Sequence, residues 1–442
     1  MRNLLLLLPA ALALAGCGLF GIGGGKKQLS AEEIAARITV NPLRENLTPD
    51  PALAATTVIL PEAQPATDWP QAGVNASKIP GHLQAGADFR IDWRAGVTGT
   101  STSKRLVAAP VAKDGKIYVI DANQVVTAFE TDNGRKVWTH ELQSSNEKRD
   151  NHSVGGGLAI AGDRLIVSSG FAYIEALALT DGKSLWRRRV DSPMSGSPAV
   201  LGNRAFVTSS NNDFYALDIA TGDIIWNDQA IAETARVLSS PSPAVTGDIL
   251  AVPYSSGELI AYLPANGRRL WNVPLTTVGQ YTPLSVINDI AGRPSIQDGV
   301  VYAASHSGVL AAIDARSGSR LWETVFGSRL GPVIGGDYLF VVGTGGKVVC
   351  FNRADGKVVW VRELPEFKNQ KSQKDRIVWT GPLLASNRLI IASSNGDVLA
   401  LSPQNGETVA DLKVGQPVYI EPIAASGKIF VLTDKGTLVA IR

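Results

Sequence analysis

The side chains that most often perform catalysis or bind metals are few in this sequence and lie far apart. The chain of 442 residues has two cysteines and four histidines, which are His82, His140, His152 and His306. No two histidines have the i, i+4 spacing, and none has the neighbouring Cys-x-x-Cys, that is typical of a metal site. Asp218 and Asp314 recur before turns, where a carboxylate usually accepts backbone hydrogen bonds. The sequence therefore predicts no catalytic residues, no metal site and no cofactor.

Cys17 is the residue whose surroundings predict a specific modification. Arg2 precedes an apolar run, residues 4–15, which is too short to cross a bilayer about 30 Å thick. The run ends in Leu14-Ala15-Gly16-Cys17, the pattern of a bacterial lipoprotein signal peptide, although an ordinary secretory signal is the alternative. We expect residues 1–16 to be removed and Cys17 to carry diacylglycerol and palmitate-type chains. Several acyl chains hold a protein on a membrane, each buried CH₂ contributing about 0.8 kcal/mol.

The next segment, residues 17–68, is rich in Gly, Ala and Pro. One phrase within it, residues 30–38, begins with Ser30 and Glu33 in the arrangement of a capping box. We expect a lipidated flexible tether with one short helix. Gly rather than Asp at position 18 favours sorting to the periplasmic face of the outer membrane. The net charge of +2 argues against a general nucleic-acid-binding surface.

A repeated phrase, Gly followed by three residues and Trp, determines the expected fold. It ends at Trp138, Trp186, Trp226, Trp271, Trp322 and Trp360, and a further copy has Ala410 in place of Trp. The copies are about 40 to 50 residues apart, the length of a propeller blade of four strands. Alternating apolar residues and turns rich in Gly, Asn and Asp fill each unit, as antiparallel strands require. We expect the glycine to supply a positive φ and the tryptophan to pack between blades.

The two ends of the repeat region predict how the ring closes. The last unit has only three strands before the chain ends at Arg442. Residues 89–94, which include Trp93, have the pattern of an outer strand without strands of their own before it. We therefore expect an all-β, eight-bladed β-propeller of four-stranded antiparallel blades over residues 69–442, in which this strand completes the last blade. Closure would remove the exposed sheet edge, and seven blades remain the alternative.

The phrases 216–226 and 312–322 resemble the tryptophan-docking repeats of the pyrroloquinoline quinone (PQQ) propeller superfamily. This resemblance implies the fold and leaves the activity open, because the superfamily includes both dehydrogenases and scaffolds. With its lipoprotein signal pattern at residues 14–17, its tether and its compact repeat units, the chain also resembles the BamB family of the β-barrel assembly machinery. That resemblance is strongest over residues 288–322 and implies an outer-membrane lipoprotein that binds the periplasmic domains of the barrel-inserting subunit BamA.

The resemblance to the BamB family also implies a partner-binding surface. Asp289 matches one of two acidic residues in a loop of the family, whereas the second position is Ala291 here. Arg236, Val237 and Leu238 match a loop with an Arg beside apolar residues.

The expected function is a non-catalytic scaffold that binds the BamA-like subunit and unfolded outer-membrane proteins and assists insertion of barrels. Two alternatives remain open. One is a periplasmic PQQ-dependent dehydrogenase-like protein, and the other is an envelope lipoprotein that binds glycan or peptidoglycan. A quinoprotein dehydrogenase needs a cation held by oxygen ligands and in many members two adjacent cysteines. The only cysteine besides Cys17 is Cys350, in an apolar run that predicts a buried thiol without a disulfide.

Overall fold

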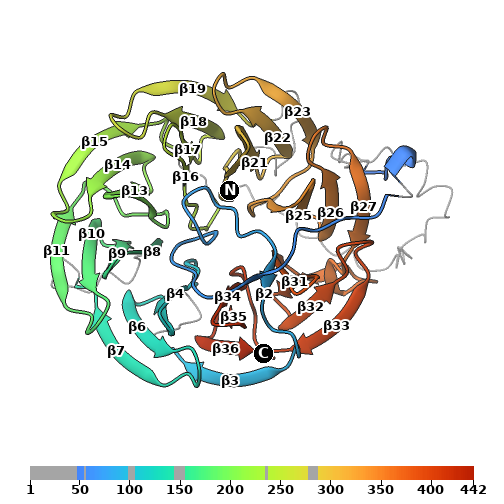
Figure 1. The fold of residues 1–442 in the computed structure, drawn as a ribbon, viewed down its shortest axis with the longest axis horizontal. Coiled ribbons are helices and arrows are strands. Elements are labelled where there is room, and N and C mark those ends of the chain that lie inside the picture. Colours follow the sequence, from blue (N-terminus) through green and yellow to red (C-terminus); the bar gives the residue numbers. More distant parts are fainter. Residues whose placement is uncertain (1–46, 54–55, 98–104, 144–154, 234–236, 277–286) are drawn as a thin grey trace, which may run out of the picture. The chain divides into compact units, whose positions relative to one another are not determined.

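Short strands with apolar residues on both faces alternate with turns, and they build the sheets that Figure 1 shows arranged around a common centre. The computed structural model describes residues 47–53, 56–97, 105–143, 155–233, 237–276 and 287–442. The all-β prediction is confirmed, because the only helical element in these ranges is one 3-10 turn, η1 (Pro51–Leu53). None of their helical segments has the length and apolar character needed to cross a membrane. The helix expected over 30–38 lies outside the described residues.

Six of the sheets are formed by four consecutive strands each. In chain order they are β4 (Val111–Lys113), β5 (Lys116–Ile120), β6 (Val125–Glu130) and β7 (Lys136–Glu141); β8 (Gly156–Ala161), β9 (Arg164–Ser169), β10 (Tyr173–Ala178) and β11 (Ser184–Arg189); β12 (Ala199–Leu201), β13 (Arg204–Thr208), β14 (Asp213–Asp218) and β15 (Ile224–Gln229); β16 (Ala244–Val245), β17 (Leu250–Pro253), β18 (Glu258–Tyr262) and β19 (Arg269–Pro274); β20 (Ser295–Gln297), β21 (Val300–Ala304), β22 (Val309–Asp314) and β23 (Arg320–Val325); and β24 (Val333–Gly335), β25 (Tyr338–Val342), β26 (Lys347–Asn352) and β27 (Val358–Glu363).

The sheet that closes the ring combines the two ends of the repeat region. It contains β3 (Ile91–Gly96), β36 (Thr437–Ile441), β35 (Lys428–Leu432) and β34 (Ile423–Ala425), in that order. β3 is antiparallel to β36, with Trp93 opposite Ala440. The N-terminal strand therefore completes the sheet that the C-terminal strands begin.

The prediction of eight blades with four strands each is wrong, because only seven sheets of the described chain have four strands. Besides the two-stranded hairpin of residues 367–376, a further sheet has six strands, in the order β1 (Gln64–Pro65), β2 (Leu83–Gln84), β30 (Trp379–Ala385), β31 (Arg388–Ser393), β32 (Asp397–Leu401) and β33 (Thr408–Lys413). β1 pairs in parallel with β2, and β2 pairs in parallel with β30, at one edge of the sheet. Strands of two residues are too short to show an alternating pattern, so sequence analysis could not predict them.

A single contact recurs at seven junctions between neighbouring sheets. A tryptophan in the outermost strand of one sheet donates its indole N–H to a backbone carbonyl oxygen of the next sheet, at 2.8 to 3.1 Å. The donors are Trp93, Trp138, Trp186, Trp226, Trp271, Trp322 and Trp360, and the acceptors are Thr131, Leu179, Ile219, Pro264, Ala315, Arg353 and Pro403. A buried indole N–H needs a partner, and the turn of the next sheet supplies it.

The glycine of each repeat lies against the tryptophan of the preceding sheet. At Gly222, φ is +75°, and a Cβ built there would come within 2.5 Å of the Trp186 ring. The glycine therefore provides both the positive φ of the turn and the space for a large ring. Ala410 replaces Trp in β33, where the neighbouring sheet consists of β34 to β36 and β3. In that sheet the third and outer strands, β36 and β3, are not consecutive in the chain and no turn joins them, so a tryptophan would have no such turn to cover.

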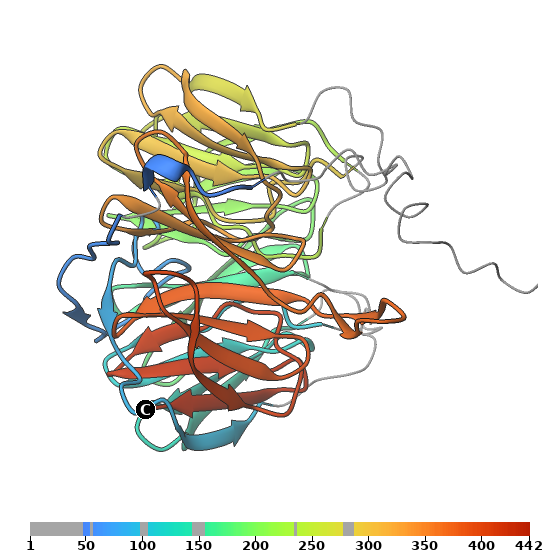
Figure 2. The same cartoon turned by 90° about the vertical axis from the view of Figure 1, so that its right-hand side faces the viewer.

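Residues before β3 cover the centre of the ring on one face. The backbone carbonyl oxygens of Pro70, Ala76 and Ser77 accept hydrogen bonds from amides of β8, β16 and β20. Figure 2 shows this part of the chain, in blue, on the face opposite the hairpin of β28 (Phe367–Asn369) and β29 (Lys374–Arg376), in orange. The segment thereby ties together innermost strands that are far apart in sequence. Residues of the expected tether also contact this unit, since Val58 is buried and exchanges hydrogen bonds with Gln404.

Apolar residues between adjacent sheets form the core, which consists of several clusters around the ring. Cys350 lies in the cluster between β24–β27 and β30–β33 and is fully buried without a disulfide, as the sequence predicted. Burial raises the pKa of its thiol far above the usual range. The thiol therefore stays protonated at neutral pH and packs as a small apolar side chain.

We predict that Gly222→Ala destabilises the protein more than Gly202→Ala does. Both positions have positive φ, but nothing lies within 4 Å of a Cβ at Gly202. The control should lose only the backbone strain of about 1–2 kcal/mol. Gly222→Ala should lose about 1–3 kcal/mol more, because the Trp186 ring must move. Urea unfolding followed by tryptophan fluorescence measures the difference, and equal losses would show that the glycine is needed for its φ alone.

Candidate functional site

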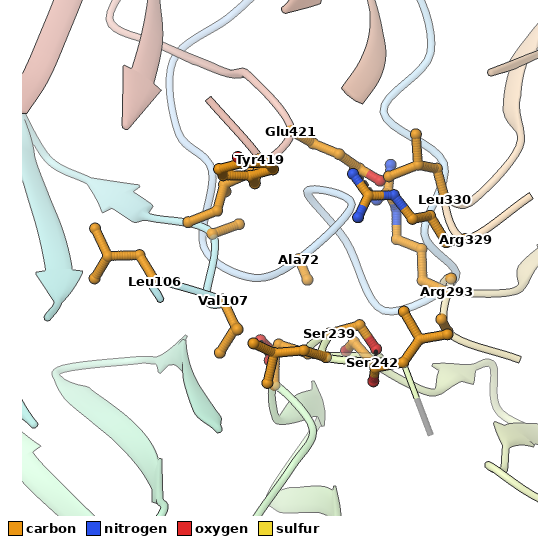
Figure 3. A pocket seen from close by; sticks show the side chains of 18 of the residues that line it. Ala72, Leu106, Val107, Ser239, Ser242, Arg293, Arg329, Leu330, Tyr419 and Glu421 are labelled. Atoms are coloured by element: carbon orange, nitrogen blue, oxygen red, sulfur yellow. Dashed lines mark hydrogen bonds and ion pairs between the residues drawn. The ribbon is translucent and has the colours of Figure 1, made fainter. Parts of the chain in front are cut away.

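The main cavity of the described residues lies at the centre of the ring and has a volume of about 320 Å³. Its walls come from the connections that lead into the innermost strands, namely residues 105–109 before β4, 237–242 before β16, 291–293 before β20, 329–330 before β24 and 419–421 before β34. Ala72, from the segment that covers the centre, also lines it (Figure 3). Strands that converge on one axis thus bring together side chains from five connections that are distant in sequence.

Charged side chains gather on one side of this cavity. Arg293 and Glu421 form an ion pair, with side chains that are 10% and 18% exposed. Arg329 lies beside them in Figure 3. The Arg105 guanidinium lies over the Tyr419 ring, 4.4 Å from its centroid, in a cation–π contact. The cavity therefore has three guanidinium groups and one carboxylate in its wall.

Serine hydroxyls and apolar side chains form the rest of the wall. Ser239, Ser240 and Ser242 precede β16, and the Ser240 hydroxyl donates to the Gly156 carbonyl oxygen at 2.7 Å. Leu106 and Val107 lie across the cavity from Arg293 and Arg329 in Figure 3. The cavity thus combines a cationic side with an apolar one.

Three of the predicted partner-binding residues, Val237, Leu238 and Asp289, lie at the rim of the same cavity. Asp289 is buried, and its Oδ2 accepts a hydrogen bond from the Val237 backbone N–H at 2.8 Å. This contact joins two loops that are separated by 52 residues. Leu238, next to it, remains 49% exposed, and Ala291 lines the cavity. Arg236 and Cys17 lie outside the described residues.

Sequence reasoning missed the charged residues of the cavity. Arg293 and Glu421 stand directly before the prolines that open their repeat units, and Arg329 stands three residues before Pro332. A comparison of the same position across the repeats could have found them. The docking tryptophans lie in the outermost strands and do not line the cavity.

The titratable groups of the described residues do not form a metal site. No group of three or more His, Cys, Asp and Glu side chains within these ranges could hold a metal ion.

Burial, together with the charge of Arg329, lowers the pKa of His306. This imidazole is therefore mostly uncharged at neutral pH.

The β28–β29 hairpin presents basic side chains away from the cavity. Lys368, Lys371, Lys374 and Arg376 are all exposed. The hairpin extends from the ring in Figure 2. Contact with an acidic surface and simple solubility both remain consistent with this arrangement.

Comparison with known proteins identifies the family. The sequence model described as outer membrane protein assembly factor BamB matches residues 87–149 and 142–362. Outer membrane protein assembly factor BamB of Yersinia pestis is 25% identical over 337 residues, which cover 75% of this chain and 83% of the relative. The crystal structure of BamB from Moraxella catarrhalis superposes with a TM-score of 0.65 at 17% identity, over 78% of this chain and 98% of that structure.

The fold by itself does not separate an assembly factor from an enzyme. Quinohemoprotein alcohol dehydrogenase from Comamonas testosteroni has the same TM-score of 0.65, at 14% identity, over 85% of this chain and 80% of that structure. The family model that matches is described as an assembly factor, whereas the structural likeness includes both classes.

We predict that Asp289→Ala loosens the loop of Val237 without unfolding the ring. Loss of a charge-assisted hydrogen bond worth about 1.5–3 kcal/mol should accelerate exchange of the Val237 amide about ten- to a hundredfold. Hydrogen exchange followed by mass spectrometry measures this rate. Asp248→Ala, at an exposed turn between β16 and β17, is the control. An unchanged rate in Asp289→Ala would mean that other contacts hold the loop.

Proposed function

The chain belongs to the family of outer membrane protein assembly factor BamB, and from that premise we propose that it is a non-catalytic scaffold of the β-barrel assembly machinery. In this role the rim of the central cavity binds the periplasmic domains of a BamA-like subunit. The protein then assists insertion of outer-membrane proteins by holding that subunit, and it contacts unfolded barrel proteins in addition. The observation that carries this proposal is the joined pair of loops at the rim, which exposes Leu238 beside a buried Asp289.

The rim has the properties that a protein interface requires. Leu238 offers an exposed aliphatic anchor, and the hydrogen bond from Val237 to Asp289 fixes the backbone beside it. A fixed loop loses little conformational entropy on binding, so more of the contact energy appears as affinity. Arg236 precedes this pair in sequence and would add a cationic contact of the kind that interfaces favour.

The proposed location follows from the N-terminal sequence and from the family. Relatives of the family are named outer membrane protein assembly factors. Acylation of Cys17 would attach the protein to that membrane, with residues 18–46 between the lipid and the ring. The ring would then lie on the periplasmic side, where domains of the barrel-inserting subunit are accessible.

A binding role also agrees with the chemistry of the described residues. The carboxylates of the repeat, such as Asp218 and Asp314, accept backbone hydrogen bonds within their own turns. Hydrogen bonds to the Ser317 backbone N–H and side chain lower the pKa of Asp314, which is the behaviour of a structural turn residue. These carboxylates form hydrogen bonds that stabilise their turns, which supports the proposed scaffold role.

We predict that Leu238→Glu releases the partner whereas Leu185→Glu does not. Leu185 is 48% exposed, in β11 on the outside of the ring, so it matches Leu238 in exposure. Burial of the new carboxylate at the interface should weaken binding more than tenfold, because a tenfold loss of affinity corresponds to only about 1.4 kcal/mol. Affinity purification of the detergent-solubilised lipoprotein, with quantification of the co-purified barrel subunit, measures the effect, and Arg236→Ala should weaken it as well.

The outcomes of this purification test the scaffold function and the position of the binding surface separately. Loss of the barrel subunit with Leu238→Glu alone supports both the function and the rim. If both variants retain the barrel subunit equally, the partner does not bind at the rim. Absence of a barrel subunit even with the unaltered protein contradicts the scaffold function itself.

A further inference from the structure

The cavity wall has more positive charge than its own carboxylate neutralises. Glu421 forms its ion pair with Arg293, which leaves Arg105 and Arg329. Neither of these two forms an ion pair within the described part of the chain. Some arginines elsewhere in the ring have carboxylate partners, as Arg187 has in Glu175 and Arg269 in Asp228.

Arg329 has a guanidinium group that its surroundings do not fully satisfy. Its Nη2 is buried and has no hydrogen-bond partner among the described residues. Burial is the main cause that lowers its pKa; the charge of Arg105 lowers the pKa further, whereas Tyr419 and Glu421 raise it. A buried donor without a partner costs about 1–3 kcal/mol, and more when the group is charged. An acceptor that enters the cavity would remove this cost.

A buried lysine close to Arg293 adds to the same imbalance. Lys78 is fully buried, and its Nζ donates to Gln71 Oε1 at 3.2 Å. Desolvation, and next the charge of Arg293, lower its pKa well below the usual range. No carboxylate forms an ion pair with this lysine in the described residues. Lys78 therefore supplies no negative charge that would compensate the arginines of the cavity wall.

We propose that the central cavity binds a carboxylate group through Arg329 and Arg105. A guanidinium group is planar and matches a carboxylate with two parallel hydrogen bonds. Leu106, Val107, Leu330 and Tyr419 also line the cavity, and they would cover an apolar body attached to that carboxylate. A strongly hydrated ion such as inorganic phosphate would gain nothing from these side chains. The site lies in the cavity whose rim carries the proposed partner surface, but binding of a carboxylate there does not require that partner.

A free organic acid and an aspartate or glutamate of a protein segment both present this group. The cavity volume of about 320 Å³ accommodates either one. The serine hydroxyls on the opposite side can donate to a second polar group of the ligand. Two pairs of probes distinguish the sources, each pair consisting of a carboxylate and its uncharged amide.

The experiment is isothermal titration of the full-length protein, purified in detergent, at low ionic strength. The first pair of probes is 3-phenylpropionate and 3-phenylpropionamide. The second is the blocked tripeptide acetyl-Leu-Asp-Leu-amide and its Asn counterpart. The variants are Arg329→Gln and Arg105→Gln, with Arg268→Gln at an exposed turn as the control. Thermal unfolding verifies that each variant is folded. Arg105 is exposed, so Arg105→Gln is the variant less prone to destabilise the fold.

We expect a carboxylate probe to bind and its amide to fail. Arg329→Gln and Arg105→Gln should each weaken binding at least tenfold, and Arg268→Gln should leave it unchanged. Tighter binding of 3-phenylpropionate identifies a free acid as the ligand, and tighter binding of the tripeptide identifies a protein segment. Failure of both carboxylates to bind, equal binding of their amides, or stronger competition by inorganic phosphate would overturn the proposal. None of these results depends on co-purification of the barrel subunit.

Discussion

The contact between a tryptophan of one sheet and a glycine turn of the next is the interaction on which the rest of the structure depends. It recurs at seven junctions, and each time the indole N–H donates to the turn that the glycine opens. Because the geometry of each junction is the same, every sheet is rotated by a similar step relative to its neighbour. The steps close a ring only when β3 joins β36, so the chain must bring its N-terminal strand to its C-terminal one.

Ring closure in turn places the functional surface. The innermost strands converge on one axis, so the connections that lead into them meet at one cavity. Arg293, Arg329 and Glu421 each come from a different connection, and none would be close to another in an open array of sheets. The segment before β3 hydrogen-bonds to several innermost strands and covers the other face. The rigid sheets therefore position variable loops, and binding resides in the loops.

The sequence predicted the parts of this fold that have a strong period. The Gly-x-x-x-Trp phrase and the unpaired strand at residues 89–94 were enough to expect sheets around a ring and the closure at β3. The two added strands of the six-stranded sheet could not be predicted, because β1 and β2 pair in parallel through two residues each. The rim was found only in part: resemblance indicated Val237 and Asp289, whereas Arg329 becomes recognisable when three-dimensional convergence brings it beside Glu421.

The most direct test of the account is site-specific photocrosslinking in intact cells, with a benzophenone amino acid in place of Leu238 or of Leu185. Both positions are about half exposed, but only Leu238 lies at the cavity rim. The account predicts a crosslink from position 238 to the periplasmic domains of the barrel-inserting subunit and none from position 185. A crosslink to that subunit from position 185 alone, or none from either position, would contradict the claim that the ring holds its partner at this rim.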